Sequence, residues 1–232
     1  MEEIDEAFEL FDRGEYEQAE QMYLRCLDEL KDEKSASYSS VLNGLGYVKS
    51  HQGQFEKAKQ YFNGVLQIAF EEDDKNKEAM ALHQLGMVER MAGKYESALA
   101  FFKREHKIWQ QHFPDFYTGF SANSYERGFI AFKQEQHERA EKLFISALDY
   151  AKGAKSPVAK GCAYRGLGEL NMAKLRFREA AIYFRKALLA FEEADDPTGA
   201  AEIQAHLQQS QLLLSENREG GIKNDNKGNP IR

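Results

Sequence analysis

Residues 45–66, LGYVKSHQGQFEKAKQYFNGVL, hold two apolar runs of helical spacing on either side of a short polar break. Apolar residues recur every three or four positions, as in an amphipathic helix, at Leu42, Leu45, Val48, Phe55, Ala58, Phe62 and Leu66. Gly53 stands in the break and can take the left-handed backbone conformation that ends a helix. The stretch therefore predicts two helices that fold back on each other as a hairpin.

The same pattern occurs five times along the chain. Its central alanines are spaced 39 to 42 residues apart, at Ala19, Ala58, Ala98, Ala140 and Ala180. An aromatic residue follows each alanine after four positions, at Tyr23, Phe62, Phe102, Phe144 and Phe184. A small residue precedes each alanine by twelve positions, at Ala7, Gly46, Gly86, Gly128 and Gly168. Because helices approach closely where a facing side chain is small, these columns predict hairpins over about residues 1–34, 35–74, 75–115, 116–155 and 156–196.

The C-terminal residues predict a cap and a tail. Residues 197–216 form one more helical pattern in which Leu207 keeps the leucine column but Gln208 replaces the glycine. A stacked array needs such a helix to cover its last apolar face. Residues 217–232, rich in Gly, Asn and Lys, are expected to form a flexible polar tail. The fold expected is all-α: five helix hairpins and a C-terminal capping helix.

Composition excludes several classes of protein. The chain has 232 residues, with 31 Lys and Arg against 38 Asp and Glu, a net charge of −7 and no basic block. This balance argues against binding to nucleic acid or to an anionic membrane. No long apolar span is present, and the start MEEIDEAFELF is acidic where a signal peptide is basic. Only two cysteines occur, so we expect a cytoplasmic protein without a disulfide framework.

No catalytic or metal-binding motif is found. The sequence contains none of HExxH, paired CxxC, GxxxxGK[ST], GxSxG or GxGxxG, and its six histidines form no i,i+4 pair. Cys26 falls in a small-residue packing column and is expected to be a core thiol, while Cys162 begins a first helix and has no histidine nearby in sequence. We therefore expect no enzyme activity, no cofactor and no metal.

The repeats resemble the tetratricopeptide repeat. The stretches LGYVKSHQGQFEKAKQYFNGVL and LGELNMAKLRFREAAIYFRKAL carry the likeness best, with Leu-Gly in the first helix and an aromatic followed by alanine after the turn. Units of about forty residues resemble the kinesin-light-chain type and the sensor domains of Gram-positive peptide-pheromone receptors. The resemblance implies a right-handed superhelix, an α-solenoid, whose concave groove is lined by the first helix of each repeat.

This resemblance places candidate ligand-binding residues in the groove. Positions three before, one after and four after each glycine are Asn43, Tyr47, Ser50, His83, Met87, Arg90, Tyr125, Phe129, Phe132, Arg165, Glu169 and Met172. Such a set can hydrogen-bond a peptide backbone and cover apolar side chains, and Arg90 or Arg165 would meet an acidic group or a C-terminal carboxylate. Only part of the set needs to touch a ligand, since any helix has an exposed face. The family's carboxylate clamp requires Asn where Tyr47 and Met87 stand, so that ligand is disfavoured.

Two residues break the core pattern in adjacent repeats. Glu105 occupies a column that elsewhere holds Cys, Val or Ala, and Arg127 replaces the leucine before the glycine. A buried charge is costly unless it is paired, so Glu105 and Arg127 are candidates for a buried ion pair. The alternative is that extra residues near PDFYTGF shift the register locally and expose both.

Two functions remain open. The first is a non-catalytic module that binds a protein or an extended peptide in the groove. The second is a self-associating scaffold or adaptor, such as a homo-oligomer, that uses its convex face or its ends. A third, an enzyme or phosphatase regulator, needs a catalytic constellation or an effector bundle, and neither is present in the sequence.

Overall fold

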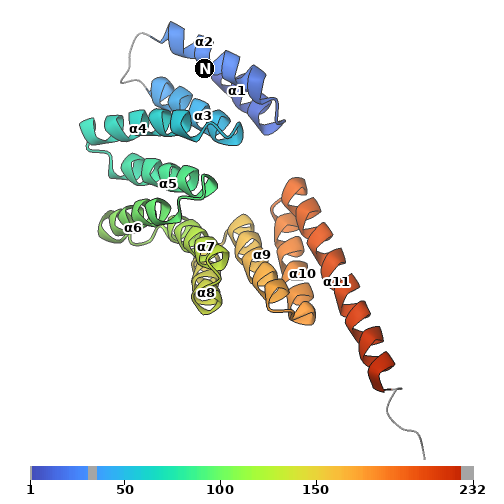
Figure 1. Cartoon of the computed structure of the whole chain (residues 1–232). Helices are drawn as coiled ribbons and strands as arrows, with labels where there is room; N and C mark the ends of the chain where they lie inside the picture. Colours follow the sequence, from blue (N-terminus) through green and yellow to red (C-terminus); the bar gives the residue numbers. More distant parts are fainter. Residues whose placement is uncertain (1, 31–35, 226–232) are drawn as a thin grey trace, which may run out of the picture. The chain divides into compact units, whose positions relative to one another are not determined.

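The chain is all-helical wherever it is described. A computed structural model describes residues 2–30 and 36–225, with side chains as far as residue 216. Within these ranges it forms eleven α-helices in two compact units, Met1–Pro114 and Asp115–Arg232 (Figure 1). The predicted all-α fold of five hairpins and a final helix is confirmed.

The first unit contains three hairpins. Their helices are α1 (Glu2–Asp12), α2 (Tyr16–Glu29), α3 (Ala36–His51), α4 (Phe55–Glu71), α5 (Lys75–Met91) and α6 (Tyr95–His112). Each helix packs on the next along the chain, and the first helices α1 and α3 also touch each other. The first helices of the first two repeats therefore lie beside each other.

The second unit contains two hairpins and the final helix. Its helices are α7 (Tyr117–Lys133), α8 (His137–Gly153), α9 (Pro157–Ala173), α10 (Phe177–Glu193) and α11 (Pro197–Asp225). Helix α11 packs on α10 and α9, and its Ile203 is fully buried in a cluster with Phe184 and Phe191. It thus covers the last apolar face, as a cap does.

Helix α11 is longer than expected. It continues through Gly220 and Gly221 to Asp225, although the sequence pattern places its end near residue 216 and a flexible tail after it. Once a helix is nucleated, each further residue adds a hydrogen bond, so two glycines do not suffice to end it. The rest of the expected tail, residues 226–232, lies outside the described residues.

The small-residue column and the aromatic column mark the positions where the two helices of a hairpin pack most closely. A Cβ atom added at Gly46, Gly86, Gly128 or Gly168 would lie 2.5–2.9 Å from the ring of the aromatic residue in the same repeat. These rings belong to Phe62, Phe102, Phe144 and Phe184, and each is at most 1% exposed. The glycine column is therefore a steric requirement of the hairpin.

The helix boundaries follow the local signals. Gly53 ends α3 with φ of 72°, as expected for a turn that needs the left-handed conformation. Ser156 and Asp196 cap the helices that start at the following prolines. Their side-chain oxygens accept hydrogen bonds from the backbone N–H of Ala159 at 3.2 Å and of Gly199 at 2.8 Å.

Candidate functional site

Two adjoining pockets lie on the first helices of the first unit. The α3–α5 pocket has a volume of about 390 Å³, and the α1–α3 pocket has a volume of about 300 Å³. Ser40, Asn43 and Tyr47 of α3 line both and form their common wall. We call the surface that carries the two pockets the first-helix face.

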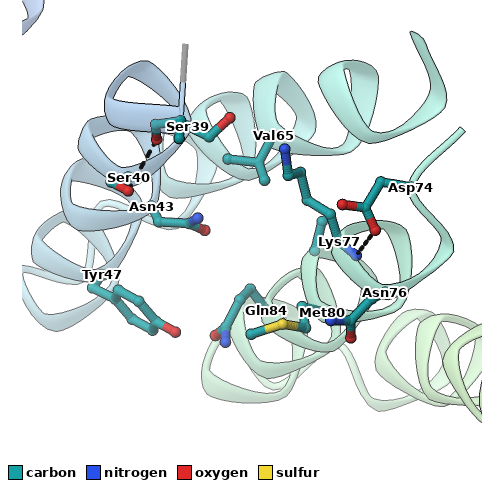
Figure 2. Close-up of a pocket in the computed structure, with 12 residues that line it drawn as sticks. Ser39, Ser40, Asn43, Tyr47, Val65, Asp74, Asn76, Lys77, Met80 and Gln84 are labelled. Atoms are coloured by element: carbon teal, nitrogen blue, oxygen red, sulfur yellow. Dashed lines mark hydrogen bonds between the residues drawn. The ribbon is translucent and has the colours of Figure 1, made fainter. Parts of the chain in front are cut away.

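The α3–α5 pocket combines polar groups with exposed apolar atoms (Figure 2). Met80 of α5 is 53% exposed and lines it. Tyr47 and Gln84 point toward each other across it; burial raises the pKa of Tyr47, and the nearby Gln84 side chain opposes part of this rise. Ser39 Oγ is buried without a hydrogen-bond partner, and the Asn43 amide makes no side-chain hydrogen bond to any described residue. The Asn43 amide is therefore available to a ligand.

The α1–α3 pocket has aromatic walls. It is lined by Ile4, Asp5, Phe8 and Phe11 of α1, by Tyr23 of α2, and by Ser40, Asn43, Gly44 and Tyr47 of α3. Phe8 is 53% exposed, and the rings of Phe11 and Tyr47 lie 6.0 Å apart. Large exposed aromatic side chains are a common source of binding energy at protein interfaces.

Of the candidates in the first unit, only Asn43 and Tyr47 line these pockets. Ser50 is buried, and its hydroxyl donates to the Gly46 carbonyl at 2.7 Å, so the expectation that Ser50 faces the groove is wrong. This bond is the backbonding to the previous turn that serine makes inside helices. Met87 and Arg90 contact each other, with Arg90 Nη2 3.9 Å from Met87 Sδ.

His83 and Glu105 form a buried cluster on α5 and α6. Glu105 is 1% exposed and accepts a hydrogen bond from Trp109 Nε1 at 3.0 Å, while His83 Nδ1 lies 3.1 Å from both carboxylate oxygens. A register shift that exposes Glu105 is therefore wrong. Arg127 belongs to the other unit, where its Nη1 lies 3.4 Å from Asn123 Oδ1, and its pairing with Glu105 stays a prediction.

The candidates in the second unit are largely engaged with one another. Arg165 donates from Nη2 to the Tyr125 hydroxyl at 2.7 Å and from Nη1 to Glu202 at 2.9 Å, and its Nε lies 4.0 Å from Glu169. Burial raises the pKa of Glu169. Glu169, Glu202 and His206 have the spacing of a metal site, but the Arg165 guanidinium already supplies the cation to both carboxylates. We assign the group as a structural charge cluster.

The remaining candidates of the second unit contribute to packing. Lys133 Nζ lies 5.2 Å from the centre of the Phe129 ring and 5.8 Å from that of Phe132. Phe132 packs against the core cluster of α8 and α9, and Met172 packs against the cluster that contains Phe184. In the second unit, the side chains at the candidate groove positions are thus partly covered by other residues of the same unit.

Several lining residues were missed although the sequence contains their signal. The rule of three before, one after and four after the small residue, applied to Ala7, gives Ile4, Phe8 and Phe11, and all three line the α1–α3 pocket. Met80 lies three positions before the groove position His83, on the same helical face one turn earlier. The groove positions thus begin one repeat and one turn earlier than expected.

The cysteines show no feature of a reactive thiol. Cys26 is 5% exposed, and burial raises its pKa, as expected for a core thiol. Burial also raises the pKa of Cys162. None of the described helices is both long enough and apolar enough to span a bilayer.

Comparisons with known proteins agree with the fold. Family models of the tetratricopeptide repeat match residues 4–37 and 37–111. No curated protein matches the chain. Among solved structures, BtubC (BKLC) from P. vanneervenii is 16% identical with a TM-score of 0.61, over 94% of this chain and 93% of that one.

Two further structures have similar folds. The apo form of RapI is 18% identical with a TM-score of 0.67, over 96% of this chain and 85% of that one. PilW, a type IV pilus biogenesis factor, is 19% identical with a TM-score of 0.59, over 89% of this chain and 91% of that one. The two family matches show tetratricopeptide repeats over residues 4–111, and the same repeat columns and helix hairpins continue beyond them to residue 193.

Proposed function

We propose that the chain is a non-catalytic module that binds an extended peptide, or a segment of a partner protein, along the first-helix face of its first unit. The observation that carries this proposal is the pair of adjoining pockets. Exposed apolar side chains at Phe8, Tyr47 and Met80 alternate there with polar groups that lack partners among the described residues, at Ser39 and Asn43. A peptide needs both, because its side chains are covered while its backbone is hydrogen-bonded.

The dimensions of the face suit a short segment. Packed helices lie ~8–10 Å apart, and an extended chain advances ~3.3–3.6 Å per residue. About three residues therefore span the step from one first helix to the next, and about six cover α1, α3 and α5. Each of the two pockets would receive one side chain, and the wall at Asn43 and Tyr47 would meet the backbone between them.

The contact expected through Arg165 fits less well. Its guanidinium already bonds Tyr125 and Glu202, so an acidic ligand would have to displace internal partners. We therefore place the main contact on the first unit rather than across the second to fifth repeats. The cytoplasmic location expected from the sequence is part of the proposal.

A matched pair of phenylalanines tests the proposal. Phe8 on α1 and Phe70 on α4 are 53% and 47% exposed, but only Phe8 lines a pocket described here. Peptides selected from a random library on the native protein should bind the Phe8→Ala variant at least ten-fold more weakly, as expected for loss of an interface anchor. The Phe70→Ala variant should bind them like the native protein, and circular dichroism should show both variants folded. The proposal is refuted if Phe70→Ala weakens binding and Phe8→Ala does not.

One observation favours the scaffold alternative. Ile182 and Leu189 on α10 are 44% and 65% exposed and lie seven positions apart, on one side of a second helix. Apolar residues in such a row are typical of a surface that associates with another chain. Sedimentation of the native protein and of an Ile182→Asp variant decides this point, because a self-associating scaffold should be an oligomer that the substitution dissociates.

A further inference from the structure

The aromatic column of the repeats carries a hydroxyl group at Tyr23. The other four positions of this column are Phe62, Phe102, Phe144 and Phe184. Tyr23 is only 3% exposed, yet it lines the α1–α3 pocket. Its ring covers Gly44 so closely that a Cβ atom there would collide with Cζ, the carbon that bears the hydroxyl. The ring therefore passes over the backbone of α3 and directs its hydroxyl to the floor of the pocket.

This hydroxyl group has no hydrogen-bond partner among residues 2–30 and 36–216. Burial raises the pKa of Tyr23 to about 12, and Cys26, Asp12 and Asp5 add to the rise, so the group stays protonated at neutral pH. Phenylalanine fills the same column in the other repeats, so the hydroxyl is not required for the packing of this position. A ligand that enters the pocket can therefore hydrogen-bond this hydroxyl.

The same pocket has an acidic rim. Helix α1 carries carboxylates at six of its 11 positions and no lysine or arginine. Asp5 lines the pocket, and neither Asp5 nor Asp12 makes an ion pair with any described residue. Lys77, which lines the adjoining pocket, is engaged by Glu72. The charge of the α1–α3 pocket is therefore negative and uncompensated within the part of the chain that the structure describes.

The walls of the pocket suit a cation with a planar or aliphatic body. The side chain of Phe8 and the rings of Phe11 and Tyr47 supply aromatic surface around Asp5. Aromatic faces attract cations, and guanidinium groups also stack on them. A guanidinium has five N–H donors, so it can bond a carboxylate and a hydroxyl at the same time.

We infer that the α1–α3 pocket binds an arginine side chain of the partner peptide, with Asp5 as its counter-ion, the Tyr23 hydroxyl as a hydrogen-bond acceptor, and the rings of Phe8, Phe11 and Tyr47 around it. This inference rests on the proposed function and names the chemistry of its ligand. It reverses the charge expected from the sequence, because the acidic α1 repels the anionic group that Arg90 and Arg165 suggest.

Citrulline tests the charge directly, because it has the shape of arginine without its charge. The probes are three fluorescein-labelled octapeptide libraries with random flanks and a fixed central arginine, citrulline or glutamate, and fluorescence anisotropy measures their binding. The arginine library should bind the native protein at least ten-fold tighter than the citrulline library, and the glutamate library should bind weakest. Higher salt should reduce the difference between arginine and citrulline.

Three variants localise the effect. Asp5→Asn should remove most of the preference for arginine, and Tyr23→Phe should reduce it three- to ten-fold. Asp28→Asn, an exposed carboxylate of α2 that does not line the pocket, should leave it unchanged. Tyr23→Phe should also melt at the same temperature as the native protein or higher, because the hydroxyl that it removes has no partner among the described residues.

Failure of the inference can be told apart from failure of the proposed function. If the libraries bind equally well and Phe8→Ala still weakens them, the first-helix face binds peptides but arginine is not its ligand. If no library binds, both are refuted. A lower melting temperature of Tyr23→Phe overturns the inference as well, because the hydroxyl would then have a structural partner.

Discussion

A single methyl group at Gly46 separates the effect of close helix packing from that of helix propensity. A Cβ atom added there would lie 2.6 Å from Cε1 and Cζ of Phe62, whereas ordinary contacts begin at 3.4 Å, so the ring must move by almost 1 Å. Phe62 is 1% exposed and has little room to move. Overpacking a core typically costs ~1–3 kcal/mol, while alanine gains ~1 kcal/mol over glycine inside a helix. Gly46→Ala should therefore lower the free energy of unfolding by up to ~2 kcal/mol.

Gly64 provides the matched control. An added Cβ atom there would meet only Leu42 Cδ1, at 3.0 Å, the end of a flexible side chain. Gly64→Ala should thus raise the stability by up to ~1 kcal/mol. Urea titrations followed by circular dichroism measure both changes, and a double-mutant cycle with Phe62→Ala removes the clash. In that background Gly46→Ala should become stabilising, and if it destabilises equally in both backgrounds, the contact with Phe62 is not the cause.

Three further predictions concern charges and the cap. Glu105→Ala and Arg127→Leu should each cost ~3–5 kcal/mol but much less than the sum when combined, and additive effects would show that the two residues do not interact. Truncation after Asp195 should lower the melting temperature and the solubility, whereas truncation after residue 218 should change neither. Burial favours a higher pKa for Glu20, but hydrogen bonds from Lys49 and a glutamine lower it from the ordinary 4.5, so its contribution to stability is present above pH 4.5 and lost as the pH falls. Glu20→Gln should therefore show a flatter acid limb in a pH titration of stability than the native protein.

The hairpins could be predicted from the sequence because packing requires their residues. Gly46 and Phe62 touch within one hairpin, so their spacing along the chain reports a contact directly. The same holds for Ser156, whose bond to Ala159 is local. Such short-range constraints recur in the repeats, and a pattern that occurs five times is distinguishable from chance.

The site was predicted only in part, because its contacts join distant helices. Arg165 is 37 residues from Glu202, which lies in a capping helix outside the repeat register, so their pairing has no sequence signal. The pattern showed that Glu105 enters a core column, but its contact with His83, 22 residues earlier, depends on how α6 packs on α5. Phe8 had a signal in the position of Ala7, which belongs to the small-residue column, but the candidate groove positions were counted only from the glycines of that column.

The turns of the two units reach the same backbone conformation with different residues. Gly53 ends a helix of the first unit with φ of 72°, whereas Leu175, 73% exposed, does so in the second unit with φ of 57°. A residue with a side chain is strained by ~1–2 kcal/mol in this conformation. Glycine avoids the strain, but it also raises the conformational entropy of the unfolded chain, which cancels part of the gain in stability. Leu175→Gly and Gly53→Ala thus shift the stability of different units in opposite directions, and neither residue lines the described pockets. The pair can serve as thermodynamic labels that assign each step of a melting curve to the half of the molecule that unfolds.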